Sequence, residues 1–213
     1  MNPTITIEKD DPRYNEVLNM VNNTDDGDLI IVARSEINRK ADRIPYIGYL
    51  NGIYFYVAMD LGNGAYAFPS SGFSFEQIAA ARYNTIKRAR IQVAPSIEDI
   101  IDDLDDEMEM NFLGKNLKTI DEFTGTDTMT ILSNEDNANG AGILWCTEYL
   151  AELKAKIGNF YILPSSIHEV LIMPDDGSMD KDYLTAMVRE VNATQVMDCD
   201  ILGDRAYSVD EWL

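Results

Sequence analysis

Residue types that commonly take part in catalysis lie closest together in the PSSIHE segment (164–169). A serine nucleophile needs a base within hydrogen-bond reach and a carboxylate that orients the base. Ser165 or Ser166, His168 and a carboxylate such as Glu169 could supply that set for a hydrolase. If His168 begins a strand, however, its side chain and that of Glu169 point to opposite faces. We therefore favour a hairpin turn whose hydroxyls and imidazole bind backbone groups, and we keep the hydrolase as the alternative.

A run of carboxylates at 98–109 is the second candidate site, because divalent cations prefer several carboxylate oxygens. Its candidate metal ligands are Asp102, Asp103 and Asp106. The run contains no glycine, which a calcium loop needs at its sharp turn, and its apolar residues recur at helical spacing. We favour a solvated helix face, with docking onto the basic segment 82–90 as a further structural option.

Other ligand-binding patterns are incomplete. The turn NEDNANG (134–140) places Cys146 where a calcium loop needs its bidentate glutamate. Gly62-Asn63-Gly64 lacks the third glycine of a dinucleotide fingerprint, so we expect no cofactor. Cys146 and Cys199 include no CxxC pair, and we interpret both as packing residues; one disulfide or one nucleophile are the alternatives.

Composition and charge limit the function further. The 213 residues carry 37 acidic and 17 basic side chains, and 46% are hydrophobic, which suits a folded protein. Residues 1–97 have 11 acidic and 10 basic side chains, whereas 98–213 have 26 and 7. Such a negative chain argues against direct binding of nucleic acid, which depends on clustered Lys and Arg. We see no membrane-spanning run and no signal peptide, so the expected location is cytoplasmic.

The first half predicts an antiparallel meander. Asn51-Gly52 separates the runs 46–50 and 53–59, and this pair is the preferred two-residue hairpin turn because both positions need positive φ. AYAF (65–68) is the expected third strand. The other predicted elements are a helix from Pro12 to Asn22, a strand at 28–33, and a helix whose capping box is Ser74 and Gln77.

The second half predicts helices between strands, packed on a mixed sheet. The expected strands are 128–133, 160–163, 169–173 and 205–209. The expected helices are an acidic one opened by Ser96, one from about Ile143 to Ile157 that ends at Gly158, and one capped by Ser178.

Several stretches resemble a bacterial family of unknown function. They are NFYILPSSIHEVLIMP (159–174), MVREVNATQV (187–196) and LGDRAYSVDE (202–211), and LSNEDNANGAGIL (132–144) is similar to a further element of that family. The resemblance covers about residues 128–213 and names no activity. It implies small cytoplasmic proteins and a shared feature that includes Pro164, Ser165, Ser166, His168, Glu169, Asn192 and Tyr207.

The sequence thus predicts an α+β fold with a near-neutral half (1–95) and an acidic half (96–213), which can also form one continuous domain. We expect a non-enzymatic binding or regulatory protein, because no catalytic set is complete and a negative field attracts basic partners. Its expected partner is a basic protein surface, and a sharper form of this hypothesis is an imitation of DNA phosphates. The oligomeric state is not indicated.

Overall fold

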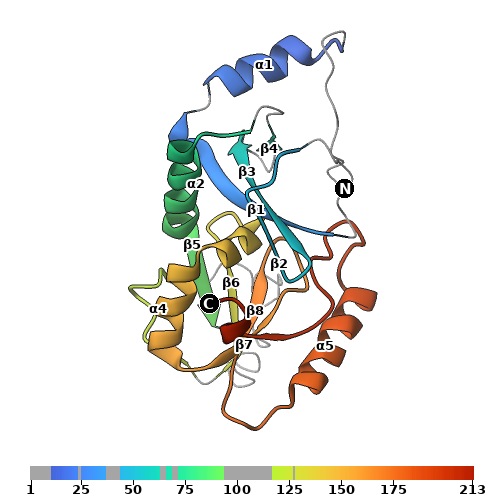
Figure 1. Ribbon diagram of the computed structural model, residues 1–213. Coiled ribbons are helices and arrows are strands. Elements are labelled where there is room, and N and C mark those ends of the chain that lie inside the picture. Colours follow the sequence, from blue (N-terminus) through green and yellow to red (C-terminus); the bar gives the residue numbers. More distant parts are fainter. Residues whose placement is uncertain are drawn as a thin grey trace, which may run out of the picture.

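The fold consists of two antiparallel sheets with helices on both sides (Figure 1). The computed structural model describes residues 11–23, 25–36, 44–62, 66–68, 72–93, 117–126 and 128–213. The predicted α+β class is confirmed. The predicted acidic helix after Ser96, with its candidate ligands Asp102, Asp103 and Asp106, lies outside the described residues.

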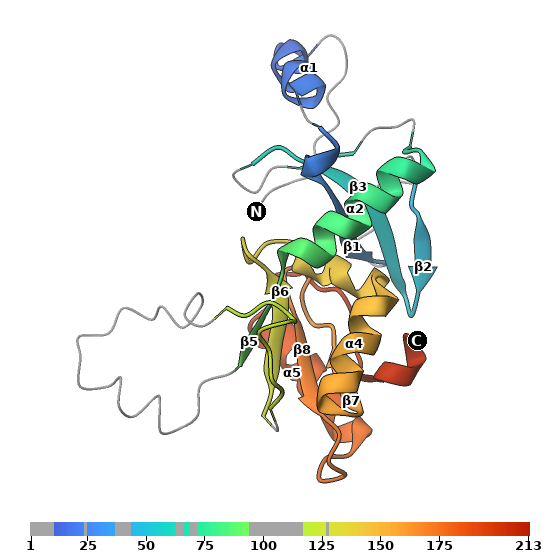
Figure 2. The same ribbon diagram turned by 90° about the vertical axis from the view of Figure 1, so that its left-hand side faces the viewer.

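The first sheet contains the predicted hairpin, but its strand order differs from that of the predicted meander. Its strands are β1 (Leu29–Ser35), β2 (Gly48–Leu50), β3 (Ile53–Asp60) and β4 (Tyr66–Ala67), and β3 pairs with each of the other three. Strand β1, and not the expected third strand, lies on the free edge of β3. Asn51 and Gly52 have φ angles of 55° and 82°, so the turn between β2 and β3 has the two positive φ values that its residues predicted. Helix α1 (Tyr14–Asn23) lies at one end of the molecule in both ribbon views (Figures 1 and 2).

Helix α2 (Phe75–Arg88) links the two sheets. Its capping box is as predicted: the Gln77 N–H donates to Ser74 Oγ, and the Ser74 N–H donates to the Gln77 side chain. The helix ends at Arg88, and the chain continues directly as strand β5 (Ala89–Val93), which the sequence analysis missed. The alternation Ala-Arg-Ile-Gln-Val fits a strand, but the helical spacing upstream concealed it.

The second sheet has the order β5-β6-β8-β7-β9. Its other strands are β6 (Thr130–Asn134), β7 (Phe160–Leu163), β8 (Val170–Pro174) and β9 (Tyr207–Ser208). All four pairings are antiparallel, where the sequence predicted a mixed sheet. The crossover from β6 to β7 skips one strand position, and β8 then returns as a hairpin into the position left between them.

Helices cover both faces of the second sheet (Figure 2). A 3-10 helix, η3 (Gly140–Trp145), leads into α4 (Thr147–Ile157), which ends before Gly158 as predicted. Helix α5 (Lys181–Thr194) lies on the opposite face, and a short 3-10 helix, η4 (Val209–Glu211), closes the chain. The cap of α5 is Asp180, whose carboxylate accepts the Asp182 N–H, rather than the predicted Ser178.

One hydrophobic core joins the two sheets. Alternate residues of both sheets, such as Ile31, Phe55, Leu132 and Ile162, lie in a single buried cluster with η3 and α4. A smaller cluster on the other face of the second sheet packs α5 against β7. The predicted halves therefore share a core, and whether either half folds alone stays a prediction.

Candidate functional site

The asparagine-rich segment after β6 forms a tight loop around one side chain. The side-chain Oδ1 of Asn134 accepts the N–H groups of Asp136 and Ala138 at 3.2 and 3.0 Å, and its Nδ2 donates to the Ala138 C=O at 2.7 Å. Asn137 and Asn139 have φ angles of 51° and 57°, a region that asparagine tolerates better than most residues. The segment is thus a polar turn between β6 and η3.

Two glycines allow η3 to pack closely on the backbone of neighbouring segments. The Gly140 N–H donates to the His168 C=O at 2.9 Å, and Ser133 Oγ donates to the same oxygen at 2.8 Å. A Cβ at Gly142 would lie 1.8 Å from the backbone oxygen of Ile31 in β1. The 3-10 helix therefore contacts both sheets through its backbone.

The PSSIHE segment lies between two other backbones. On one side, the Ala141 N–H donates to the Ile167 C=O at 3.2 Å. On the other side, the Ile167 N–H donates to the Asp200 C=O at 2.9 Å, and the Leu202 N–H donates to the Ser165 C=O at 3.1 Å. Ser165 and Ser166 are both buried. This segment is held as a strand-like connection between η3 and residues 200–202.

The imidazole of His168 has partners at both ring nitrogens, and neither partner is a serine. Nδ1 accepts the backbone N–H of Asn139 at 3.2 Å, and Nε2 lies 3.6 Å from Asp200 Oδ2. Since Nδ1 accepts, the proton of the neutral ring is on Nε2 and faces Asp200. Ser166 Oγ accepts the backbone N–H of His168 at 3.0 Å, so its contact with His168 is to the backbone.

A carboxylate and a guanidinium complete this cluster. Burial raises the pKa of Glu169, the neighbouring His168 lowers it, and Asp200 raises it further. Arg34, at the end of β1, donates from Nη1 to Asn139 Oδ1 at 2.8 Å and to the Ala33 C=O at 2.7 Å. Burial lowers the pKa of Arg34, and the Asp200 carboxylate acts in the opposite direction.

We call Arg34, Asn139, His168, Glu169 and Asp200 the His168 cluster. The sequence analysis identified His168 and Glu169 but missed the other three. Arg34 offered one clue, a charged residue within an otherwise buried strand. Asn139 and Asp200 stood in turns that any polar residue could occupy, so no pattern marked them.

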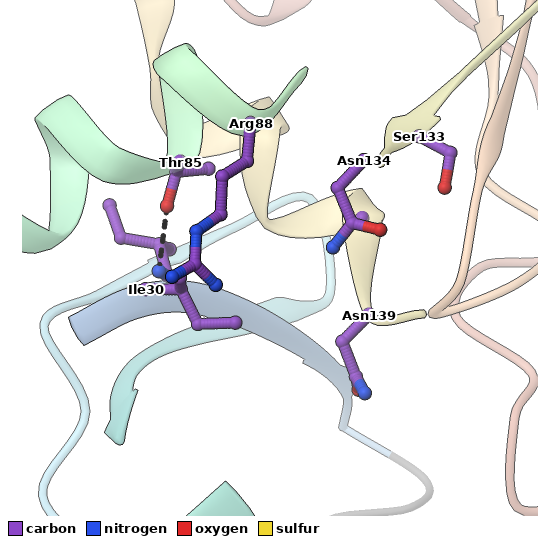
Figure 3. Close-up of a pocket in the computed structure, with 8 residues that line it drawn as sticks. Ile30, Thr85, Arg88, Ser133, Asn134 and Asn139 are labelled. Carbon is purple, nitrogen blue, oxygen red and sulfur yellow. Dashed lines mark hydrogen bonds between the residues drawn. The ribbon is translucent and has the colours of Figure 1, made fainter. Parts of the chain in front are cut away.

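A small hollow lies beside this cluster (Figure 3). It is lined by Ile30, Ile31, Thr85, Arg88, Ser133, Asn134, Asn139 and Gly140. Its volume of about 10 Å³ is about the space of one water molecule. Thr85 Oγ1 accepts the Ile31 N–H at 2.8 Å, so it binds the backbone of β1. Arg88 forms an ion pair at 2.8 Å with Asp60, the last residue of β3.

The other residues of the shared motifs hold the last part of the chain. Asn192 Nδ2 donates to the Gly203 C=O at 2.7 Å. Tyr207 donates its hydroxyl to the Asn51 C=O at 2.8 Å, which connects β9 to the hairpin of the first sheet. Pro164 packs so closely on Gly203 that a Cβ there would lie 3.0 Å from Pro164 Cγ. In these contacts the motif residues bind backbone groups.

The remaining candidate groups of the sequence analysis are the two cysteines and possible metal ligands. Cys146 and Cys199 are both free, and burial raises the pKa of Cys146 to about 12, which keeps its thiol protonated. Within the described ranges, no group of three or more His, Cys, Asp or Glu side chains is arranged to hold a metal ion. The basic side chains of Arg82, Arg88 and Arg90 pair with Glu148, Asp60 and Glu135.

The fold and the motifs agree with the comparison to known families. The structure defines an α+β protein with antiparallel sheets. The family of unknown function DUF5688 matches residues 70–211, and the chain belongs to it. This range begins before the 128–213 of the sequence resemblance and includes α2 and β5. No curated protein and no solved structure shows significant similarity to the chain. In the part that the structure describes, no helix has the length and apolar character needed to cross a membrane.

Proposed function

We propose that the protein is a non-enzymatic binding module that engages a basic protein surface through the face around α5. The main support is the excess of acidic side chains, because most basic side chains of the described residues already pair with carboxylates of the same chain. The described residues include 12 basic and 25 acidic side chains. Seven of these basic side chains form ion pairs with carboxylates: Arg13, Arg82, Arg88, Arg90, Lys154, Lys181 and Arg205.

The carboxylates around α5 are exposed and close together along the chain. They are Asp175, Asp176, Asp180, Asp182 and Glu190. Within the described residues, Asp175, Asp176 and Asp180 accept backbone N–H groups and form no ion pair. The two cations of this region are engaged elsewhere, since Lys181 pairs with Glu211 and Arg189 Nε donates to the Asp204 C=O at 3.1 Å.

Apolar side chains accompany this charge. Tyr183 is 59% exposed and Met179 is 39% exposed, beside Asp180 and Asp182. Tyrosine is enriched at protein interfaces, and methionine adapts to varied partners. Helix α5 lies on the outer side of the second sheet (Figures 1 and 2), so a partner could approach this face. A negative field would speed the encounter with a basic partner, and the apolar contacts would add to its lifetime.

The test uses the full chain and a lysine-rich amphipathic helical peptide as the probe. One variant removes three charges around α5: Asp175→Asn, Asp176→Asn and Asp182→Asn. The matched control removes three exposed charges elsewhere: Glu16→Gln, Asp121→Asn and Glu152→Gln. Binding is measured by fluorescence anisotropy at about 100 mM salt, where charges more than about 10 Å apart are largely screened.

We expect the α5 variant to bind about tenfold more weakly, because three exposed charges each contribute about 0.5 kcal/mol. The control should change the affinity less than about twofold, since its charges are remote and screened. Equal losses in both variants would contradict a defined α5 face. Absence of binding by the unmodified protein would contradict the proposal itself.

A sharper form of the proposal is that the acidic face imitates DNA phosphates. The purified protein should then displace duplex DNA from a nuclease or repressor at low salt, where electrostatic binding is strongest. Failure to displace DNA would remove this form and leave the general one. A cytoplasmic location is part of the proposal, and the free thiols of Cys146 and Cys199 are consistent with a reducing compartment.

The alternative function, a hydrolase that uses Ser165 or Ser166 with His168 and a carboxylate, stays a prediction. The observation in its favour is Asp200, which lies 3.6 Å from the imidazole and could orient it. Catalysis would require the imidazole to exchange Asn139 or Asp200 for a serine hydroxyl. Ester hydrolysis that is lost in both Ser166→Ala and His168→Asn would support this alternative.

A further inference from the structure

The imidazole of His168 connects a titratable ring directly to a backbone N–H. Its Nδ1 accepts the Asn139 N–H at 3.2 Å, and this side chain is 35% exposed, so protons can reach it from solvent. Only the neutral ring can accept at Nδ1, because both nitrogens of an imidazolium are donors. Protonation would therefore place two donors opposite each other at this contact.

We propose that protonation of His168 releases Asn139 and loosens the 134–142 loop, which makes the loop a pH-sensitive switch. This regulation is independent of the proposed binding function. An imidazole is the ionisable side chain that generally changes charge between pH 5 and 8, so the switch is tested across that range.

The charged groups around the ring favour its movement on protonation. Asp200, from the segment before Ile201, lies 3.6 Å from Nε2 and attracts an imidazolium. Glu169, next to His168 in the chain, adds a second carboxyl group. Arg34, from β1, is bound to the Asn139 side chain at 2.8 Å and repels a second cation on that side. The imidazolium is thus drawn toward Asp200 and away from Asn139.

Two further titratable groups lie nearby and do not oppose this movement. Cys199 donates from Sγ to Asp200 Oδ1 at 3.6 Å, and Tyr66 donates its hydroxyl to the Ala138 C=O at 3.5 Å. Burial raises the pKa of Tyr66, so its hydroxyl stays neutral across the tested range.

The loop has a reason to change once Asn139 is released. Asn139 has a φ of 57°, in the left-handed region that residues other than glycine populate sparsely, although asparagine does so more often than most. The imidazole accepts the backbone N–H of Asn139, and Arg34 donates to the Asn139 side chain. Loss of the imidazole contact frees the Asn139 backbone N–H, while Arg34 and Tyr66 still bind the side chain beside the hollow that Asn139 lines.

The experiment measures the Asn139 amide in the full-length ¹⁵N-labelled protein between pH 8 and pH 5. We expect its hydrogen exchange, corrected for the intrinsic rate at each pH, to become about tenfold faster on acidification, as the loss of one hydrogen bond predicts. The matched control is His168→Asn, whose amide oxygen can accept the same N–H and does not titrate. Its Asn139 exchange should stay constant.

Two results would overturn the proposal. Constant exchange in the unmodified protein would show that protonation does not reach the loop, and the same acceleration in His168→Asn would assign it to Glu169 or Asp200. If that variant does not fold, the ring nitrogens of the unmodified protein provide a second readout. Their long-range ¹H–¹⁵N spectrum should show a proton on Nε2 at pH 8, and a proton on Nδ1 would contradict the contact on which the switch depends.

Discussion

Replacement of Gly142 by alanine tests the close contact between η3 and β1. The added Cβ would lie 1.8 Å from the backbone oxygen of Ile31 and 2.5 Å from its carbonyl carbon. The obstacle is backbone, so no side chain can rotate away from it. The Gly142 φ is outside the positive range, which makes the expected effect one of space rather than of backbone strain.

The size of the effect follows from the displacement that alanine requires. Cβ atoms in proteins essentially never lie within 3.0 Å of another heavy atom of this kind, so η3 and β1 must separate by at least about 1.2 Å, the difference between 3.0 and 1.8 Å. That separation opens the core where Ile143 and Leu144 are buried against the first sheet. We expect the free energy of unfolding to fall by about 3–5 kcal/mol. This is above the usual cost of overpacking, because the backbone cannot adjust locally.

Urea denaturation followed by far-UV circular dichroism measures this loss. With a slope of about 2.5 kcal/mol/M, the midpoint should fall by about 1–2 M. Gly62→Ala is the control, because Gly62 has a φ of 78° with nothing within 4 Å of the added Cβ. It should cost only about 1 kcal/mol of backbone strain. A Gly142→Ala midpoint no lower than that of the control would refute the close contact.

Two further predictions concern the end of the chain. Burial alone would raise the pKa of Glu211, but hydrogen bonds from Lys181, the Ser208 N–H and Arg205 lower it from 4.5 to about 2. A depressed carboxyl pKa stabilises the fold above pH 4.5, and this contribution is lost as the pH falls toward 2. The side chain is 31% exposed, so we expect about 1–2 kcal/mol after solvent screening. Glu211→Gln should remove that part of the acid sensitivity in urea melts at pH 6 and pH 3, and an unchanged pH dependence would contradict it. Trp212, which follows η4, is 3% exposed and its ring contacts Phe55 of the first sheet, so Trp212→Ala should cost about 3–5 kcal/mol by the same assay. A loss below about 1 kcal/mol would show that the C-terminal contact does not join the sheets.

The sequence predicted turns and helix caps correctly where neighbouring residues alone determine them. The Asn51-Gly52 turn has the two positive φ angles that its residues require, and the Ser74 capping box forms with both of its hydrogen bonds. The same reasoning misplaced the start of α5 by two residues. Ser178 and Asp180 are both good caps, and the choice depended on how the chain leaves β8.

The periodicity of the sequence could not indicate the strand order and pairing of the second sheet. Its strands β6, β7, β8 and β9 were expected near their observed positions, but their order and antiparallel pairing were not. The start of strand β5 was assigned to the helix before it, because Ala89 and Arg90 continue the helical spacing of α2. The partner decides between the two structures: β5 forms five residue pairs with β6, and these stabilise the strand that its alternation also fits.

The sequence by itself determined the class of fold, the hairpin, the helix cap and the excess of negative charge, because each depends on neighbouring residues or on composition. The tertiary structure decided the surroundings and hydrogen-bond partners of the candidate site residues. The PSSIHE segment became a backbone connection because Asn139, Gly140, Ala141, Asp200 and Leu202 surround it. Arg34 and Asn139 are 105 residues apart, and their contact exists only because η3 packs on β1. Such contacts depend on distant segments meeting in space, and no pattern of adjacent residues records them.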